Sequence, residues 1–507
     1  MSRVYGGNSD MGGQDTSVVI IGTGFSGLGM AIQLKQAGRH DFVILEKAED
    51  VGGTWRDNTY PGCACDIPSH LYSFSYEQNP EWSRLYAGQR EIWDYLRICA
   101  DKHNLREHIR FGVKVTGAAF DDATLRWTVR TESGDTYTAD AMVAGIGALH
   151  IPSIPDLPGM ERFQGESFHS AQWNHDYDLT GKRVAVVGTG ASAIQFVPEI
   201  AKQVEQLTLF QRTPAWVMPK ADRPVSKVEK TFFRNLPATQ WLRRTALFWA
   251  LDSRALAFTF NPKLMKFASQ PVRKQIKEQV HDPELRRKLT PDYTMGCKRV
   301  LISNDYYPTF NRPNVDLVTE GITEVREQSV VTADGVEHEV DAIIFGTGFH
   351  VTDAFDYLDI KGRNGVDLTS QWREKGLETY LGIGVSGFPN LFFLLGPNTG
   401  LGHNSVVLMI EAQARYVLQC LQLLASHDVT AMDVRPAPQR KFNLEIQRKL
   451  RKGVWSVGGC NSWYLDSAGV NRTVWPGFVW QYVLRTRKVE LADYELLAAT
   501  RTTTPVG

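Results

Sequence analysis

Two glycine-rich turns, each followed at the same offset by a charged side chain, are the residues best suited to chemistry. Gly22, Gly24 and Gly27 form a GxGxxG turn, and Glu46 lies 24 positions after Gly22. The first glycine permits a tight bend, the second lets the backbone approach a pyrophosphate, and the third permits close helix packing. A carboxylate at this offset can accept hydrogen bonds from both hydroxyls of an adenosine ribose. The turn therefore predicts a site for a dinucleotide with an unphosphorylated adenosine ribose, as in FAD. Neighbouring residues expected at this site are Phe25, Ser26 and Lys47.

The second turn has a positive charge where the first has a negative one. Gly188, Gly190 and Ala193 form GxGxxA, and Arg212 lies 24 positions after Gly188. A guanidinium binds a 2′-phosphate in a bidentate manner, whereas a carboxylate would repel it, so this turn should select NADPH over NADH. A solvated surface arginine is the alternative interpretation of Arg212. The other residues expected at this site are Thr189, Ala191, Ser192 and Thr213.

The composition favours a small-molecule partner. Lys plus Arg and Asp plus Glu both number 56, so no overall field exists to attract nucleic acid. The 507 residues exceed one ordinary core and favour two or three domains. The six cysteines contain no zinc-type pair and no spacing typical of a disulfide framework, which favours a reducing, cytoplasmic environment.

Strands and helices of the βαβ type must position the two turns. Residues 17–47 have the pattern of a buried strand, the first turn, a helix and a second strand. The pattern returns at residues 183–210, with the second turn 166 positions after the first. The fold class expected is therefore α/β, with two dinucleotide-binding (Rossmann-like) domains and a duplicated nucleotide-binding function.

The segments between and after the two units indicate an insertion. Residues 141–159 pass from an apolar strand to a proline-rich stretch suited to a stiff crossover. Residues 340–350 repeat the strand-then-glycine pattern and should carry the chain back to the first domain, so the NADPH domain is inserted into the FAD domain. The expected divisions are 1–149 and 346–507 for the FAD domain, 150–219 and 295–345 for the NADPH domain, and 220–294 for a helical excursion.

The sequence contains neither a secretory signal at its start nor an apolar stretch long enough to span a membrane. Met1–Asp15 is polar and glycine-rich and lacks the pattern of a secretory signal, so a flexible leader is expected. The most membrane-like stretch, Thr245–Leu251, is far shorter than the roughly 20 apolar residues that a span requires.

Two further motifs carry a resemblance to a known family. Phe163, Gly165, His169 and Trp173 match FxGxxxHxxxW, a fingerprint of Baeyer-Villiger monooxygenases, although Asn174 stands where that family usually has Pro or Asp. The stretch 52–66 resembles the family's other signature. Its matching residues are Gly53, Trp55, Tyr60, Pro61, Gly62 and Asp66.

The resemblance implies a reaction and the residues for it. A Baeyer-Villiger monooxygenase uses NADPH and O2 to insert one oxygen atom beside a ketone carbonyl, giving an ester or lactone through a C4a-peroxyflavin. Lys298 and Arg299 resemble the family's Lys-Arg pair, in which the arginine supports the peroxyflavin and the lysine reaches the NADPH phosphate. Asp66 would orient Arg299 near the nicotinamide. Further residues that match FAD contacts in the family are Thr54, Trp55, Tyr72 and Val115.

Several residues keep a structural alternative beside the functional one. The linker position of His169 favours a conformational role over proton transfer, and the spacing of Cys63 and Cys65 favours packing over redox work. Asn398 and His403 lie on a glycine-rich turn that either approaches the flavin or is ordinary loop. The C-terminal aromatic segments WYLD and WPGF resemble those of monooxygenases that act on linear, aryl or larger ketones.

Two other functions compete with this interpretation. An N- or S-oxygenating flavin monooxygenase is the nearest alternative, and Trp173 and Arg299 argue against it. A nonenzymatic sensor of redox state would also carry both nucleotide turns but has no use for Asp66 paired with Arg299.

Overall fold

The computed structural model describes residues 14–351, 358–427 and 429–498. Most of the leader expected over Met1–Asp15 lies outside the described residues, but Gln14 and Asp15 already belong to strand β1 (Gln14–Ile21). No helix in these ranges is long and apolar enough to cross a membrane.

The first sheet holds the strands of the first predicted βαβ unit at its centre. Its order is β17-β4-β5-β6-β1-β2-β3, and β18 pairs with β6. β1 runs parallel to β2 and to β6, and helix α1 (Phe25–Gln36) joins β1 to β2. The remaining strands are β2 (Phe42–Leu45), β3 (Ile109–Arg110), β4 (Val115–Asp121), β5 (Arg126–Thr131), β6 (Thr136–Ala144), β17 (Asp359–Lys361) and β18 (Leu391–Phe393).

The second sheet is parallel throughout and has the order β12-β9-β8-β16-β7. Helix α4 (Ala193–Ile200) joins β8 to β9. All five strands come between β6 and β17 in the sequence, which confirms that one domain is inserted into the other. Its strands are β7 (Glu166–His169), β8 (Arg183–Val187), β9 (Gln206–Phe210), β12 (Val315–Val318) and β16 (Ala342–Phe345). Because β16 still pairs in this sheet, the chain returns to the first sheet only after Phe345.

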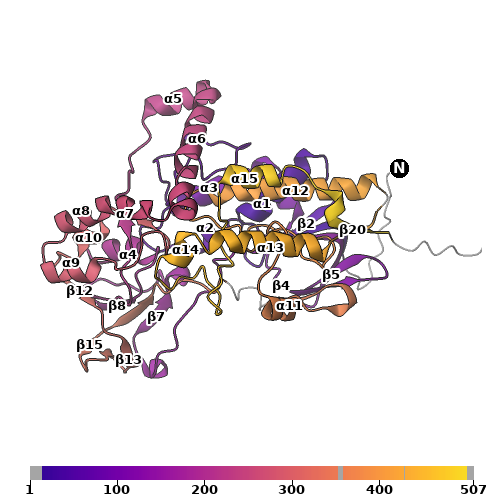
Figure 1. Ribbon diagram of the computed structural model, residues 1–507. Helices are drawn as coiled ribbons and strands as arrows, with labels where there is room; N and C mark the ends of the chain where they lie inside the picture. The colour runs from indigo at the N-terminus through magenta and orange to yellow at the C-terminus, as the bar shows by residue number, and fades with distance from the viewer. Residues whose placement is uncertain (1–13, 352–357, 428, 499–507) are drawn as a thin grey trace, which may run out of the picture.

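The helical excursion is confirmed as a run of helices between β10 (Val217–Met218) and β11 (Leu301–Ile302). In Figure 1, α5 and α6 project away from the rest of the molecule. The run consists of α5 (Lys227–Asn235), α6 (Pro237–Asp252), the π-helix η4 (Leu256–Phe260), α7 (Leu264–Ala268), α8 (Gln270–Gln279) and α9 (Pro283–Leu289).

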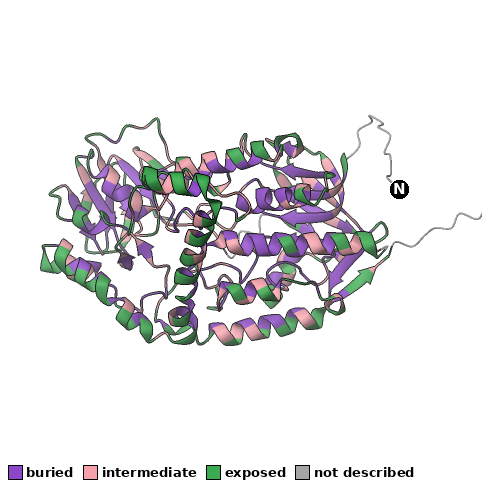
Figure 2. Ribbon diagram, turned by 90° about the horizontal axis from the view of Figure 1, so that it is seen from above, coloured by how far each residue is buried: buried purple, intermediate pink, exposed green. Residues whose placement is uncertain are grey.

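The chain after β18 covers the first sheet. The long helix α12 packs along α1, and Figure 1 shows both helices beside the strands of that sheet. Burial concentrates in the central strands and in the inner faces of these helices, as Figure 2 shows. The remaining helices are α2 (Thr54–Asp57), α3 (Gln89–Lys102), α10 (Tyr306–Thr309), α11 (Leu368–Lys375), α12 (Val406–Ser426), α13 (Pro436–Leu450), α14 (Val454–Val457) and α15 (Val479–Arg485). The minor strands are β13 (Ile322–Val325), β14 (Ser329–Thr332), β15 (Glu337–Glu339), β19 (Ala431–Val434) and β20 (Tyr494–Leu497), and short 3-10 turns are η1 (Arg106–His108), η2 (Met160–Arg162), η3 (Ser170–Gln172), η6 (Arg363–Gly365) and η7 (Leu491–Asp493).

Candidate functional site

The first glycine turn is held against the end of β6. Gly22 has a φ of +92°, and a Cβ on it would lie 2.8 Å from the carbonyl oxygen of Gly145. A Cβ on Gly27 would lie 1.8 Å from the carbonyl oxygen of Gly22, so the helix can start this close to the strand only with glycine. At Gly24, by contrast, a Cβ would meet only the Cα of Gly53, at 3.8 Å. The middle glycine therefore faces open space, as a pyrophosphate-binding backbone requires.

The second turn repeats this geometry against the end of β16. Gly188 has a φ of +105°, and its Cβ would lie 2.6 Å from the carbonyl oxygen of Gly346. Ala193 packs close to Gly346 at the start of α4, whereas a Cβ on Gly190 would come no closer than 3.6 Å to any atom. Both turns thus combine a tight first position with an open second one. This shared shape fits the phosphates of two dinucleotides.

Glu46 lies beside the first turn, immediately after β2. Its carboxylate accepts hydrogen bonds from the backbone N–H of Thr23 at 2.9 Å and from the Thr23 hydroxyl at 2.6 Å. Its other oxygen accepts from the backbone N–H of Ala48 at 3.0 Å and lies 3.1 Å from Nη1 of Arg56. The side chain is buried, and these donors fix its carboxyl group at the carboxyl edge of the sheet. Lys47, next in sequence, is exposed.

Other residues predicted near the flavin form an aromatic cluster behind the first turn. The Trp55 indole N–H donates to the Tyr72 hydroxyl at 3.1 Å, and the Phe25 and Tyr72 rings meet edge to face at 5.0 Å between centroids. Thr54 is exposed at the start of α2. Val115 begins β4, two residues after the chain donates a hydrogen bond from Val113 to the carbonyl of Glu46. Ser26 is buried in the first turn of α1.

Arg212 and Lys298 line one pocket of about 750 Å³ beside the second turn. Thr189 of the turn donates to the carbonyl of Thr213 at 2.9 Å, which fixes the loop that carries Arg212. Burial and the nearby Arg212 charge both lower the pKa of Lys298. Among the residues lining this pocket only Asp292 is acidic, whereas Arg287 and Lys288 add further positive charge. Cations that repel one another in one pocket form a site for an anion such as a phosphate.

Asp66 and Arg299 form an ion pair, although they are 233 positions apart in the sequence. Nε and Nη2 of Arg299 donate to one carboxylate oxygen of Asp66 at 2.9 and 2.6 Å, and Nη1 lies 3.5 Å from the carbonyl oxygen of Leu401. The Asp66 charge raises the pKa of Arg299, so the guanidinium stays positive at every physiological pH. The pair is about three-quarters buried, with 28% and 26% of the two side chains exposed.

The signature that ends at Asp66 spans the two nucleotide turns. At one end Gly53 lies against Gly24 of the first turn. At the other, the Tyr60 hydroxyl donates to the amide oxygen of Gln195 on α4 at 3.0 Å. Gly62 has a φ of +77°, and its Cβ would lie 2.7 Å from the carbonyl oxygen of Gln195, so a side chain would separate the two domains here. Pro61 lies between these contacts.

The fingerprint residues pack on the second sheet and on α4. A Cβ on Gly165 would lie 2.4 Å from the carbonyl oxygen of Asp341, and Phe163 folds over it. Trp173 packs against Phe196 of α4 at 5.3 Å between ring centroids. His169 is 1% exposed, its Nδ1 accepts from the backbone N–H of Ala171 at 3.1 Å, and burial lowers its pKa. These contacts fit the structural role expected for His169. Asn174, where the motif departs from the family pattern, donates to Glu166 at 2.8 Å.

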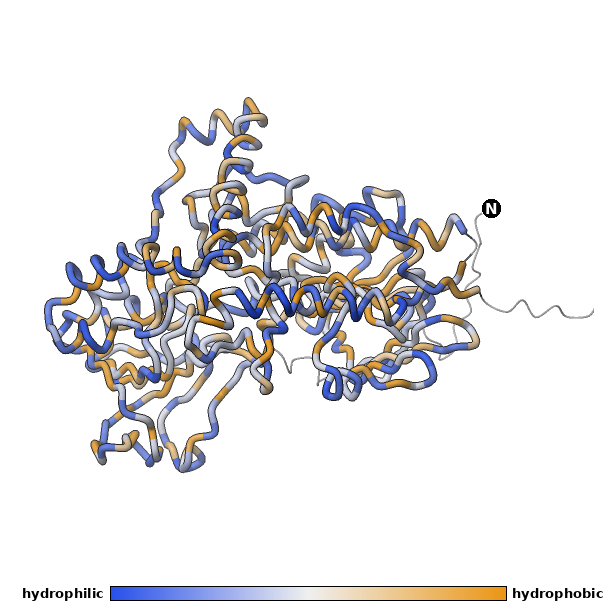
Figure 3. The backbone as a smooth tube through the Cα atoms, viewed as in Figure 1, coloured by the Kyte–Doolittle hydropathy of each residue, from blue (hydrophilic) through white to orange (hydrophobic). Residues whose placement is uncertain are grey.

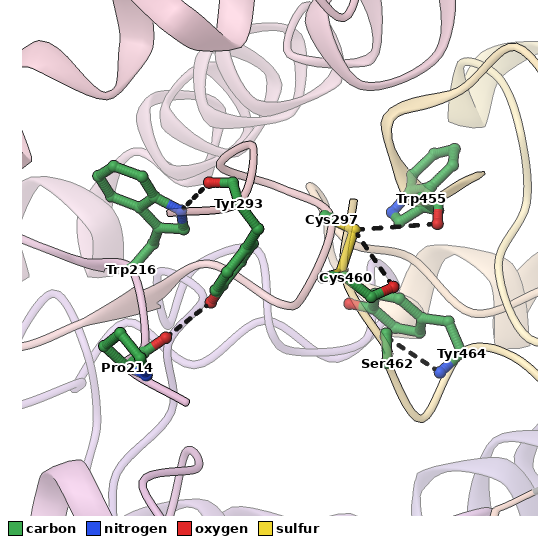
Figure 4. The surroundings of a disulfide bond; sticks show 8 residues. All are labelled: Pro214, Trp216, Tyr293, Cys297, Trp455, Cys460, Ser462 and Tyr464. Atoms are coloured by element: carbon green, nitrogen blue, oxygen red, sulfur yellow. Dashed lines mark hydrogen bonds between the residues drawn. A yellow bond between two sulfur atoms is a disulfide. The ribbon is translucent and has the colours of Figure 1, made fainter. Parts of the chain in front are cut away.

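A disulfide joins Cys297 to Cys460, with 6.2 Å between their Cα atoms. The expectation of no disulfide framework was wrong, because the two cysteines are 163 positions apart and only the tertiary fold brings them together. The inference of a reducing environment loses the support it drew from cysteine spacing. Figure 4 shows the bond beside Trp455 and Tyr464, with Tyr293 on the opposite side. The bond ties the turn before Lys298 to the C-terminal chain.

Cys63 and Cys65 remain thiols. Burial raises the pKa of Cys63 to about 12 and raises that of Cys65 as well, so neither forms the thiolate that redox or nucleophilic chemistry requires. The packing role expected for them therefore fits.

The glycine-rich turn after β18 meets the C-terminal aromatic residues. A Cβ on Gly402 would lie 3.6 Å from the Trp455 indole nitrogen and 3.8 Å from the Tyr464 hydroxyl, and both of these buried polar atoms lack a hydrogen-bond partner among the described residues. Burial raises the pKa of Tyr464 to about 12, against the opposing effect of the nearby Arg299. Unpartnered buried donors beside Arg299 indicate a position for a polar ligand atom.

Asn398 and His403, the two residues singled out on this turn, have different surroundings. Asn398 has a φ of +59° and donates from its side chain to the carbonyl of Asn471 at 3.1 Å, which anchors the turn to the C-terminal chain. His403 is fully buried, with Nε2 3.5 Å from the Asp252 carboxylate. The contacts of both side chains are therefore with Asn471 and Asp252, residues that anchor the turn within the fold.

Three residues of the candidate site escaped the sequence patterns. Gln195, Trp455 and Tyr464 become part of the site only through packing between segments far apart in the sequence. The aromatic WYLD segment pointed to the region of Tyr464 but not to its position beside Arg299.

Comparisons with known proteins agree with this geometry. The profile of the family described as flavin-binding monooxygenase-like matches residues 15–363. A Pseudomonas aeruginosa protein named Baeyer-Villiger monooxygenase is 52% identical over 97% of this chain and 92% of its own length. The closed crystal structure of cyclohexanone monooxygenase is similar with a TM-score of 0.86 and 29% identity, covering 96% of this chain and all of that one. The OTEMO protein in complex with FAD and NADP is similar with a TM-score of 0.86 and 30% identity, over 96% of this chain and all of that one.

Proposed function

The chain belongs to the Baeyer-Villiger monooxygenases of the flavin-binding monooxygenase-like family, and we propose that it converts a ketone to an ester or lactone with NADPH and O2. The observation that carries this proposal is the Asp66–Arg299 pair. Asp66 ends the segment that spans both nucleotide turns, and Arg299 directly follows the lysine that lines the second pocket. A fixed cation therefore stands where two dinucleotides would meet.

The two cofactors have distinct candidate sites. FAD would be held by the turn at Gly22–Gly27, with Glu46 toward its ribose, and NADPH by the turn at Gly188–Ala193, with Arg212 and Lys298 toward its 2′-phosphate. When bound, the flavin supplies the redox chemistry, taking electrons from NADPH and activating O2. The protein's part is to bind, to orient and to provide charge.

Arg299 supplies the charge that oxygen insertion needs. The reaction passes through anionic oxygen, and a preorganised cation in a site that excludes water stabilises such charge without reorganising. Arg299 cannot lose its proton, and Asp66 holds both Nε and Nη2 so that Nη1 is turned toward the Leu401 carbonyl. A cation that titrates, such as a protonated histidine, would lose its positive charge at higher pH, whereas the guanidinium keeps its charge.

The buried aromatic residues beside Arg299 keep the site dry and add donors. Trp455 and Tyr464 are each 1% exposed, and their N–H and O–H groups face the turn at Gly402. We assign them to hydrogen bonding with a polar atom of a bound ligand. Their rings exclude water, which strengthens every charge interaction in the site.

The reaction is tested by purifying the yellow protein and following NADPH oxidation against a panel of linear, cyclic and aryl ketones, amines and sulfides. Products are identified by mass spectrometry. Ester or lactone formation with a gain of one oxygen atom supports the proposal. Turnover confined to amines or sulfides contradicts it.

Arg299→Ala separates the two half-reactions. Hydride transfer to FAD should continue, but ester formation should fall by about 10²-fold, the scale for losing one preorganised electrostatic group. Arg299→Lys should retain part of the activity because it keeps the charge but not the two-point contact with Asp66. Arg326→Ala, which changes an exposed arginine on the second domain, is the matched control. Wild-type ester formation by Arg299→Ala would refute the role of this residue.

A further inference from the structure

Helix α6 places Leu247, Phe248 and Leu251 against the core, but it also buries polar side chains and exposes large aromatic ones. Its buried residues include Gln240, Arg244 and Asp252, whereas Trp241 is 62% exposed and Trp249 is 55% exposed. A helix on the surface of a soluble domain normally buries its apolar stripe and exposes its charges. The two exposed tryptophans therefore leave an apolar surface that suits a partner outside the described chain.

The buried polar residues of α6 are held by specific hydrogen bonds, so the helix cannot rotate to bury its exposed tryptophans. Nη1 of Arg244 donates to the carbonyls of His70 and Ser73, both at 2.9 Å. The side-chain amide of Gln240 donates to the carbonyl of Asn79 at 2.7 Å. Rotating α6 would leave these carbonyls and a buried guanidinium without partners, which is strongly unfavourable.

Helix α5 extends the same apolar surface. Val228 and Phe232, four positions apart and therefore on one face, are 65% and 52% exposed, and Leu236 at the junction with α6 is 53% exposed. Of the 21 large apolar side chains exposed in the described ranges, ten lie between Val228 and Phe267. Apolar exposure is therefore concentrated in this region rather than scattered. Figure 3 shows hydrophobic residues along the projecting helices. Figure 1 shows that these two helices stand clear of the sheets.

The charge of this region identifies the partner. Residues 227–268 contain eight Lys and Arg but only two acidic residues, although the whole chain is balanced at 56 of each. Lys227, Lys263 and Lys266 are exposed and have no ion pair within the described part of the chain. Two copies of this surface would bring like charges together, whereas anionic lipid head groups would neutralise them. A basic helix that exposes Trp, Phe and Leu is typical of proteins that lie in the membrane interface.

We propose that α5 and α6 form a docking arm for an anionic lipid bilayer. Trp241, Leu242 and Trp249 enter the boundary between head groups and acyl chains, and the exposed Lys227 of α5 contacts the head groups. Because no described helix can span a membrane, the attachment is peripheral and reversible. The arm is separate from Arg299 and the nucleotide turns, so this proposal stands independently of the reaction.

Vesicle flotation of the FAD-loaded enzyme tests the arm. Vesicles are made of phosphatidylcholine alone or with about one-third phosphatidylglycerol, to supply the negative surface charge. The wild type should float with the anionic vesicles only, and raising the salt from about 0.1 M to about 0.5 M should reduce its binding by screening. Trp fluorescence should shift to the blue when the anionic vesicles are added.

The double variant Trp241→Glu, Leu242→Glu should lower the bound fraction about tenfold, because it removes apolar contact and adds repulsion. Both side chains are largely exposed, so the fold should persist, which far-UV circular dichroism checks. Leu444→Glu, at a 67% exposed position of α13, is the matched control and should bind like the wild type. Failure of the wild type to float with anionic vesicles would overturn the proposal. So would an arm-dependent dimer in sedimentation velocity without flotation, since the arm would then be a protein interface.

Discussion

Arg212→Ala should remove much of the preference for NADPH over NADH. Arg212 and Lys298 line the same pocket, and their mutual repulsion adds to the burial that lowers the pKa of Lys298. A bound 2′-phosphate would relieve that repulsion by pairing with both cations. NADH has no such phosphate, so the loss should fall on NADPH alone.

The sizes of the two contributions follow from burial. Hydrogen bonds to charged groups contribute about 1.5–3 kcal/mol, and solvent screening reduces this at exposed sites. Arg212 is exposed, so its removal should weaken NADPH binding about tenfold, which corresponds to about 1.4 kcal/mol. Lys298 is half-buried and should contribute more, about 30-fold. The double variant should lose more than the sum of the single losses, because removing one cation relieves the repulsion on the other and so partly compensates each single loss.

The assay is the KM and the direct dissociation constant for NADPH and for NADH in each variant. Because a lysine is charged only below its pKa, NADPH affinity should fall as the pH rises through the lowered pKa of Lys298, and NADH affinity should not. Lys202→Ala, an exposed lysine shortly after α4, is the control. An unchanged ratio of NADPH to NADH affinity in Arg212→Ala would refute the phosphate assignment and leave Arg212 as a solvated surface arginine.

Further predictions concern the first turn, the disulfide and a buried histidine. Gly24→Val should fold but lose FAD, because the new side chain fills the open face of the turn, and a variant that purifies yellow would contradict this. Cys460→Ser, or reduction of the wild type, should lower the melting temperature. The loss in the free energy of unfolding should be at most the roughly 4–5 kcal/mol expected for opening so long a loop. A thermal scan with and without reductant checks this, and the variant should not respond to the reductant. Burial and the nearby arginines lower the pKa of His70 to about 4. Since the unfolded chain binds that proton more readily, this contribution to stability is complete above about pH 6.5 and is lost toward pH 4, by about 3 kcal/mol. His70→Phe should flatten the dependence of the free energy of unfolding on pH over this range, and an equally steep dependence would exclude His70 as its cause.

The parts of the site that could be predicted from the sequence are those built from residues close together in the chain. A strand, a glycine turn and a helix must follow one another for Gly22 or Gly188 to work, and the ribose partner must come one strand later. Glu46 and Arg212 therefore lie where their offsets indicate. The pairing of Asp66 with Arg299 could not be obtained from local pattern, because 233 positions separate them, and it rested on resemblance to a family.

Contacts that depend on packing between distant segments could not be predicted at all. Gln195 on α4 has no motif of its own, and its role becomes visible only when Tyr60 and Gly62 are placed against it. The cysteines at positions 297 and 460 show no spacing rule, because a disulfide requires proximity of Cα atoms and not any interval in the chain. The tryptophans and leucines of α6 could equally pack into a core, so only the burial of each side chain in the folded protein distinguishes an interaction surface from a core.

The turn at Cys297–Arg299 explains how one short segment can serve three parts of the site. Cys297 is bonded to the C-terminal chain, Lys298 lines the pocket of Arg212, and Arg299 is paired with Asp66. Successive residues point to different neighbours, so a shift of this turn would change all three contacts together. The disulfide also keeps Tyr464, four residues after Cys460, near the Arg299 guanidinium. Hence the C-terminal chain is linked through the disulfide to the cation proposed to support oxygen insertion. Breaking the disulfide should therefore weaken NADPH binding and also lower the fraction of oxidised NADPH that yields ester or lactone.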